Sequence, residues 1–184
     1  GDLFFESRAT LNPQEDPDNV FIFIGMENVE SNTGDLTGNL SKKGVEIKSR
    51  SKTFSEGQIL YGRLRPTLNK VYLCSSDTPN GICSGEFIVL NVREGLVRPR
   101  VLREILSSEF VLEQVIRFIA GAALPRVSFS DLASIEVPLP SVETQMKLEK
   151  SLFDLDARRK KLKKELSEIP KIFSKILLEA QKLS

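Results

Sequence analysis

Short apolar runs separated by loop-forming residues fill the first 140 positions of the chain. The clearest runs are VFIFIG (20–25), GQILYGRL (57–64), KVYLCS (70–75) and EFIVLNV (86–92). Runs of this length between turn-forming residues are typical of buried strands. The segment ENVESNTGDLTGNLS (27–41) is predicted to be a loop, and Asn80–Gly81 predicts a turn in TPNGICS (78–84).

The apolar spacing becomes helical after residue 97. RPRVLREILSS (98–108) and SEFVLEQVIRFIAG (108–121) are predicted helices, with Ser108 as N-cap and Gly121 as the stop. Ser128 and Asp131 have the spacing of a capping box for one further helical turn. Residues 135–138 are expected to form an edge strand.

A heptad pattern of apolar residues marks the last third of the chain. The predicted seam residues are Leu148, Leu152, Leu155, Leu162, Leu166 and Ile169. Arg159 interrupts the seam, which continues through Phe173, Ile176, Ala180 and Leu183. We expect a helix to Glu168, a kink at Pro170 and a second helix in nearly the same phase. Such a stripe needs a second chain or another helix as its partner, although folding back onto its own domain stays open.

These patterns together predict an α/β (α+β) fold. The expected parts are a globular mixed-sheet domain (1–140) and a long helical region (141–184), with the kink near Pro170. The chain has 184 residues, of which 40% are hydrophobic, so one core with an elongated appendage is expected.

Composition adds predictions about location and metals. No apolar run approaches the roughly 20 residues of a membrane span, and no export signal is visible, so we expect a cytoplasmic protein without membrane contact. Cys74 and Cys83 form no CxxC motif and His is absent, so no zinc site is expected.

Charge is unevenly distributed although the net charge is only +1. Residues 1–41 contain eight acidic residues against Arg8 alone, whereas residues 42–70 contain eight basic residues against Glu46 and Glu56. A local basic face could bind a polyanion. Alternatively, the acidic segment balances the basic one within the same domain.

The absence of His excludes Ser-His-Asp and Cys-His catalysis, and no phosphate-binding glycine loop is present. One weak catalytic pattern remains: Asp35 followed by Glu46 and Lys48 is similar to the Asp…Glu-x-Lys pattern of metal-dependent nucleases. The alternative is that these are ordinary surface residues.

Three stretches, taken in order, resemble one family. FIGMENVESNTGDL (23–36), FSEGQILYGRLRPTLNKV with GICSGEFIVL (54–71 and 81–90), and FIAGAALPRVSFSDLASIEVPLPSVETQMKLEK (118–150) are similar to blocks of type I restriction–modification specificity (S) subunits. The resemblance extends to the related C-terminal domain of fused adenine methyltransferase/restriction enzymes. The resemblance covers most of residues 21–150.

The resemblance implies a target recognition domain, which binds part of a DNA site, followed by a helical conserved region that packs as a coiled coil. It implies double-stranded DNA and an adenine-N6 methyltransferase (M) subunit or fused domain as partners, and no catalytic residue, metal or cofactor in this chain. The chain is then expected to be either a half-sized subunit that dimerises through the C-terminal helix or a fragment of a longer protein. A coiled-coil adaptor for other proteins is the remaining alternative.

Under this hypothesis the basic residues around LYGRLRPTLNK (60–70) are the first candidates for DNA contacts. The predicted contact residues are Tyr61, Arg63, Arg65, Asn69, Lys70, Lys48, Arg50, Lys52 and Arg126. Phosphate contacts fix register, whereas base edges carry sequence information. Arg65 could instead form a structural salt bridge with Glu56 or Glu86. The residues that read bases are expected in the loop 28–44, which can change without disturbing a core.

Overall fold

The structure is a computed structural model that describes residues 1–93, 95–119, 121 and 123–181, without the side chains of residues 177 and 179–181. It divides into two compact units, residues 1–142 and 143–184. The first unit contains every strand of the described chain, and the described residues of the second form a single helix.

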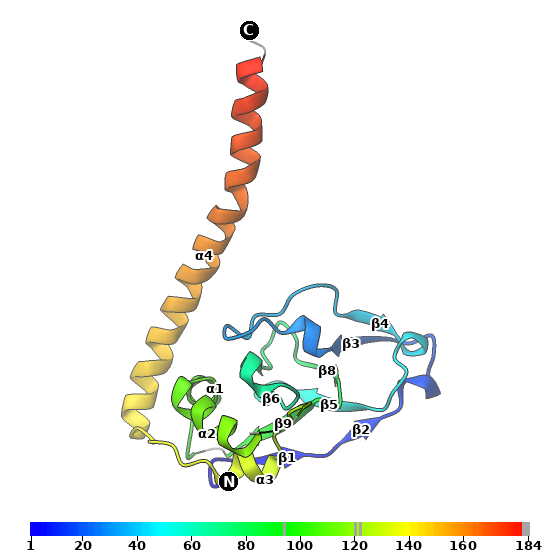
Figure 1. Cartoon of the computed structure of the whole chain (residues 1–184), viewed down its shortest axis with the longest axis vertical. Coiled ribbons are helices and arrows are strands. Elements are labelled where there is room, and N and C mark those ends of the chain that lie inside the picture. Colours follow the sequence, from blue (N-terminus) through cyan, green and yellow to red (C-terminus); the bar gives the residue numbers. More distant parts are fainter. Residues whose placement is uncertain (94, 120, 122, 182–184) are drawn as a thin grey trace. The chain divides into compact units, whose positions relative to one another are not determined.

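The first unit is built around an antiparallel sheet of four strands (Figure 1). Its order is β1 (Phe4–Ser7), β9 (Phe87–Val92), β6 (Ile59–Gly62) and β7 (Val71–Leu73). Successive side chains of a strand point to opposite faces. Both faces of this sheet are covered, which explains why β6 and β9 are apolar at nearly every position.

A second, mixed sheet has five shorter strands. Its order is β2 (Thr10–Leu11), β5 (Ser51–Ser55), β8 (Asn80–Cys83), β3 (Val20–Ile24) and β4 (Ser41–Lys43). Only β3 and β8 pair in parallel.

Three helices cover one face of the first sheet: α1 (Pro99–Leu106), α2 (Glu109–Ile119) and α3 (Phe129–Ser134) (Figure 1). They pack Leu102, Val115 and Leu132 against alternate strand residues such as Ile59 and Ile88. The predicted capping box of α3 is confirmed, because the Ser128 hydroxyl accepts from the Asp131 amide and the Asp131 carboxylate accepts from the Ser128 amide.

The opposite face of the first sheet packs against the second sheet. Leu60, Phe87 and Val89 meet residues such as Ile24 and Phe54 in this second core. Both cysteines are buried there as free thiols, and burial raises the pKa of Cys83 to about 12. The thiols are therefore protonated and inert at neutral pH.

Two elements predicted within the first unit are wrong. Asn80 and Gly81 lie in β8 and not in a turn, because Gly81 lets the Phe54 ring pack closely: a Cβ there would lie 2.6 Å from Phe54 Cζ. Residues 135–138 form no strand, since Ile135 and Val137 pack against the first core without pairing.

Short 3-10 helices shape the connections of the first unit. They are η1 (Pro13–Glu15), η2 (Met26–Asn28), η3 (Gly44–Glu46) and η4 (Pro66–Leu68). Of these, η4 packs against α2, and η1 packs against η3.

The described residues of the second unit belong to α4 (Val142–Gln181), one helix that continues through Pro170. The predicted second helix is therefore not separate: strong helix formers on both sides continue the helix, which changes direction only gently in its orange-to-red part (Figure 1). Among the described residues, no helix is both long and apolar enough to cross a membrane.

The predicted seam residues of α4 are exposed, from 41% for Leu148 to 65% for Leu166, except Leu152, which is half-buried. Leu183 and the side chain of Ala180 lie outside the described residues.

Candidate nucleic-acid interface

The chain leaves β6 along a fixed path. The Arg63 amide donates to the Glu86 carbonyl, and the Arg65 amide donates to the Pro125 carbonyl at 2.9 Å each. The Val127 amide donates to the Arg63 carbonyl at 3.1 Å. These bonds fasten residues 63–65 between the start of β9 and residues 125–127.

Arg65 has a left-handed backbone, with φ of 47°, at the start of η4. Most L-residues avoid this region, and Gly or Asn adopt it more readily. The Arg65 side chain is exposed, and none of the ion pairs found among the described residues involves it. The expected alternative of a salt bridge from Arg65 to Glu56 or Glu86 is therefore not observed.

Three of the predicted contacts in residues 60–70 have structural partners instead. Tyr61 is only 2% exposed in the first core, where burial raises the pKa of its hydroxyl. Asn69 is buried and donates to the Ser107 carbonyl at 2.8 Å. Lys70 Nζ donates to the Met26 carbonyl at 2.6 Å. These positions do not fit a direct role in DNA contact, because each side chain supports the fold.

Arg126 forms a two-pronged ion pair with Glu86, with Nη2 to Oε1 at 2.8 Å and Nε to Oε2 at 3.0 Å. The hydrogen bonds from Arg126 hold the pKa of Glu86 below its usual range. Burial opposes this effect, and the Arg126 and Arg63 charges add to it. Arg63 is half-buried. The predicted contacts Arg126 and Arg63 thus lie beside a carboxylate, which reduces the charge they offer to a phosphate.

The second basic segment, residues 43–52, is anchored by Gln14. Its side-chain amide donates to the Gly44, Val45 and Ile47 carbonyls at 3.0, 3.2 and 2.8 Å. Lys48 and Arg50 are exposed in this segment, and Lys48 Nζ donates to the Val45 carbonyl.

Lys52 differs from these neighbours because it is largely buried. Its Nζ lies 3.2 Å from Glu6 Oε1, with both side chains 16% exposed. Lys52 therefore does not fit the expected phosphate contact.

The loop 29–40 makes up most of the segment 28–44 that is expected to read bases, and it lies directly beside η4. The Asn32 amide donates to the Asn69 carbonyl at 3.0 Å, and Asn69 Nδ2 donates to Asn32 Oδ1 at 3.3 Å. We call the loop 29–40 together with residues 65–69 the loop platform. Asn32, Arg65 and Asn69 are the non-glycine residues with positive φ in the described chain, and all three belong to the platform. Strained backbone of this kind tends to cluster at functional sites.

The sequence reasoning missed Arg103, which lies in α1 and contacts the loop platform. It is 5% exposed, and its Nη2 donates to the Asn32 and Thr33 carbonyls. A usable signal was present, because Arg103 is a cation between Leu102 and Leu106 on the apolar side of its helix.

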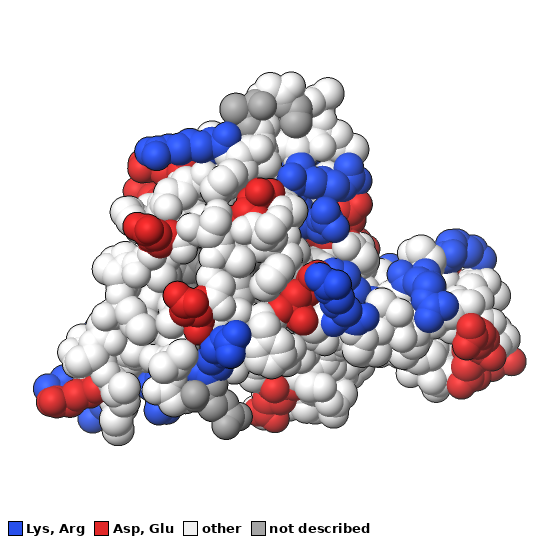
Figure 2. Space-filling view, turned by 90° about the horizontal axis from the view of Figure 1, so that it is seen from below, with Lys and Arg blue, Asp and Glu red and all other residues white. Residues whose placement is uncertain are grey.

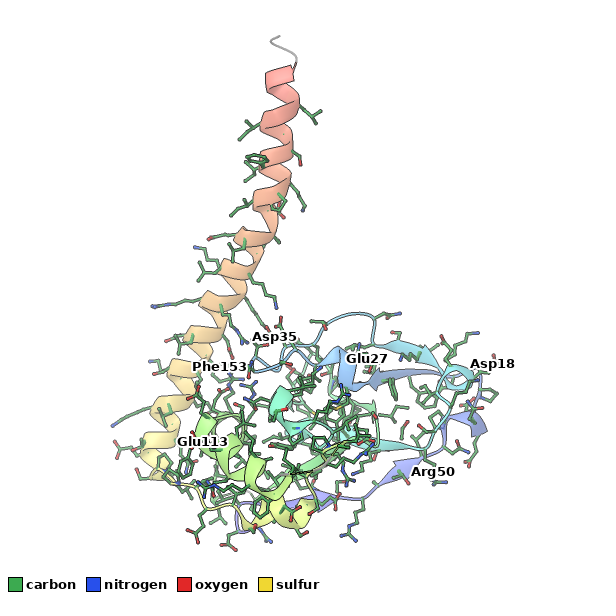
Figure 3. The ribbon with its side chains drawn as sticks, in the orientation of Figure 1. Asp18, Glu27, Asp35, Arg50, Glu113 and Phe153 are labelled. Carbon is green, nitrogen blue, oxygen red and sulfur yellow. The ribbon has the colours of Figure 1, made fainter. Side chains whose placement is uncertain are left out.

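The structure contradicts the nuclease hypothesis. Figure 3 shows Asp35 on the opposite side of the first unit from Asp18, and η3, which contains Glu46, packs against the residues next to Asp18. The Glu46 carboxylate accepts from the Lys43 amide, and no cluster of three potential metal ligands exists among the described residues. Asp35, Glu46 and Lys48 therefore do not form one site.

Lys48 and Arg50 also lie away from the loop platform. Figure 3 shows Arg50 on the same side as Asp18 and remote from Asp35. The face in Figure 2 shows basic and acidic side chains interspersed. The part of the unit that this view shows has basic residues separated by acidic and uncharged ones, and it has no broad basic surface.

Comparison with known proteins decides the family. Residues 1–171 match the family described as the type I restriction modification DNA specificity domain, a match that includes the whole first unit and most of α4. The chain belongs to this family. The similarity stated from the three sequence blocks is thereby confirmed.

Two curated specificity subunits are similar to this family member. The HindI specificity subunit of Haemophilus influenzae is 27% identical over 133 residues, covering 68% of this chain and 29% of the relative. The EcoDI specificity subunit of Escherichia coli is 25% identical over 163 residues, covering 86% of this chain and 35% of the relative. The chain thus spans about a third of the length of these curated relatives.

Solved structures support the fold. The HsdS subunit from Thermoanaerobacter tengcongensis has a TM-score of 0.74 at 22% identity, covering 88% of this chain and 42% of that one. A chain from a study of complex assembly and conformational transition of the type I R-M system has a TM-score of 0.75 at 22% identity, covering 91% and 43%. The α/β fold with its long C-terminal helix is therefore similar to that of these two solved chains, one of which is an HsdS subunit.

Proposed function

We propose that residues 1–142 are a DNA target recognition domain of a type I restriction–modification system. The family match over residues 1–171 is the observation that carries this proposal. The domain binds one part of a double-stranded DNA target and directs an adenine-N6 methyltransferase subunit or fused domain to it, in the cytoplasm, without catalysing a reaction itself.

The loop platform is the proposed contact surface. Arg65 is exposed beside the loop that contains Asn32, Thr37 and Asn39, which are also exposed. A guanidinium suits phosphate, and an asparagine amide suits the edge of adenine. Arg65 would therefore fix the register while the loop reads bases.

Arg63 and Arg126 contribute a weaker phosphate contact in this proposal, because the nearby Glu86 carboxylate offsets part of their positive charge. Lys48 and Arg50 form a separate contact on the side of the unit that bears Asp18. Two separated cationic points along a duplex would fix the orientation of the domain better than one.

α4 is the proposed spacer and pairing helix. Its exposed seam fits a coiled coil with a second copy of this chain or with another helix of a longer specificity subunit. Sedimentation of the purified chain separates the two cases, since a second copy would give a concentration-dependent dimer.

The binding proposal is tested by titrating the full chain with labelled duplex DNA at several salt concentrations. Phosphate contacts release counterions, so log K should fall linearly with log salt. No binding at low salt, or an affinity independent of salt, would overturn the proposal. Incubation of the same DNA with Mg²⁺ should leave it uncut.

A further inference from the structure

We infer that Arg103 is a positioning residue for DNA reading, because it holds the loop 30–35 in one place relative to η4. The inference rests on the proposed function and adds a residue that would not itself touch DNA. Its basis is a set of hydrogen bonds that joins α1, β7, η4 and the loop at one point.

The Arg103 guanidinium divides its donors between the sheet, its own helix and the loop. Nε donates to the Val71 carbonyl of β7 at 3.1 Å, and Nη1 donates to Glu104 Oε1 at 2.7 Å. Nη2 donates to the carbonyls of Asn32 and Thr33 in the loop. Only a planar fork of several donors can serve three elements at once.

Burying the Arg103 guanidinium costs free energy, which indicates that Arg103 does more than fill space in the core. A buried charge is destabilising without hydrogen bonds and a counter-charge, and an apolar residue of similar volume often packs as well. Glu104 supplies the counter-charge, and it also pairs with Arg100 Nη2 at 3.0 Å. Arg103 therefore has both hydrogen bonds and a counter-charge. A Leu or Met at this position would fill a similar volume without needing either.

The loop is shaped to accept Arg103. Gly34 has a φ of 70°, and a Cβ at this position would lie 2.4 Å from Arg103 Nη2 and 2.1 Å from the Val71 carbonyl oxygen. Glycine is thus required for the loop to approach both groups. The Glu30 amide donates to the Asp35 carbonyl at 2.9 Å and closes the loop.

Asn69 locks the same loop from the side of η4. Its carbonyl accepts from the Asn32 amide at 3.0 Å, while its Nδ2 donates to Asn32 Oδ1 and to the Ser107 carbonyl after α1. Arg103 and Asn69 therefore fix Asn32 from two directions. A base-reading side chain on this loop then keeps its position relative to Arg65, as specific recognition requires.

The test compares wild-type, Arg103→Lys and the control Arg117→Lys, which is the same change at an exposed position of α2. Binding sites are selected from a random duplex library with the full chain, and affinities are measured for selected and scrambled DNA. Arg103→Lys keeps the charge but loses the fork. We expect its preference for selected over scrambled DNA to fall at least about tenfold, comparable to one lost base contact, while affinity for scrambled DNA stays within about twofold.

A second variant, Asn69→Gly, guards against misfolding of the first. Glycine suits the φ of 47° at this position and removes both side-chain bonds. Amide hydrogen exchange of residues 30–35 should speed up about tenfold or more in both variants, whereas β6 and β9 should keep their protection.

The outcomes separate the two proposals. Wild-type protein that selects no sequence overturns the proposed function, while the exchange measurement still decides whether Arg103 holds the loop. A selected sequence read equally well by wild-type and both variants, or unchanged exchange in residues 30–35, overturns the positioning role.

Discussion

The two units of this chain bury their apolar residues in opposite ways. In residues 1–142, Phe87, Leu60 and Ile88 are at most 1% exposed between the sheets or under the helices. In α4, Phe173 is 63% exposed, and the seam residues Leu155, Leu162 and Leu166 are 58% to 65% exposed. The first unit completes its own core, whereas the second presents an apolar stripe without a cover in the described chain.

This difference indicates what each unit needs. The free energy of unfolding of the first unit comes from its own layers, and changes at its surface should affect binding more than folding. An isolated amphipathic helix is marginal in water and gains stability from packing. The helix should therefore depend on a partner, and the contrast can be tested by equal substitutions in the two units.

The largest expected effect comes from Phe87→Ala in the core between the sheets. Phenylalanine truncation in a core costs about 3–5 kcal/mol of unfolding free energy. The matched change Phe173→Ala on α4 should alter the unfolding of the first unit by less than about 0.5 kcal/mol. Urea unfolding of the full chain, followed by a signal from the sheets, checks both. Equal losses in the two variants would erase the proposed distinction.

A second effect concerns association through α4. Leu155→Lys together with Leu162→Lys places two charges on the seam. Each leucine that loses burial costs about 1.5 kcal/mol or more, so association should weaken at least about 100-fold. Analytical ultracentrifugation against wild-type measures this change. Wild-type and variant that sediment identically as monomers would show that α4 does not pair copies of this chain.

A smaller effect is expected from Arg65→Asn in the absence of DNA. Asparagine adopts the left-handed region more easily, so the variant should be more stable by up to about 1 kcal/mol. Arg50→Asn, where φ is not positive, serves as the control and should show no gain. Chemical denaturation checks the pair. A loss of stability in Arg65→Asn would mean that the arginine side chain supports the fold.

The smallest expected effect is a change in pH dependence from Glu86→Gln. Because Arg126 lowers the pKa of Glu86 in the folded chain, the stabilisation is present above the unfolded pKa of about 4.3 and is lost as pH falls through the lower folded value. Stability of the variant should therefore fall less steeply below about pH 4.3 than that of wild-type. Glu109→Gln, exposed on α2, is the control. Parallel curves for wild-type and Glu86→Gln would contradict the assigned ion pair.

Strong local signals predicted much of the fold. The apolar strands β3, β6, β7 and β9, the helices α1 and α2 and the capping box at Ser128 followed from runs and periods. The missed strands β1, β2, β4 and β5 are short or polar and owe their pairing to neighbours far along the chain. Gly81 shows the same limit, since the close approach of Phe54 and not the local Asn-Gly pair determines its conformation.

The candidate site was less predictable than the fold because a basic residue in a sequence does not reveal its partner. Within residues 60–70, Lys70 binds a carbonyl, whereas Arg65 remains exposed. Lys52 pairs with Glu6, which is 46 positions away. Arg103 could not be linked to Asn32 without the tertiary fold, since 71 positions separate them.

The most direct test measures DNA affinity for wild-type and Arg65→Asn with the full chain at fixed salt. If Arg65 contacts a DNA phosphate, the variant should be at least as stable as wild-type. It should nevertheless bind all duplex sequences about tenfold more weakly, and the slope of log K against log salt should be smaller by roughly one. Unchanged affinity and salt slope in this folded variant would contradict the assignment of the loop platform as the DNA-binding surface.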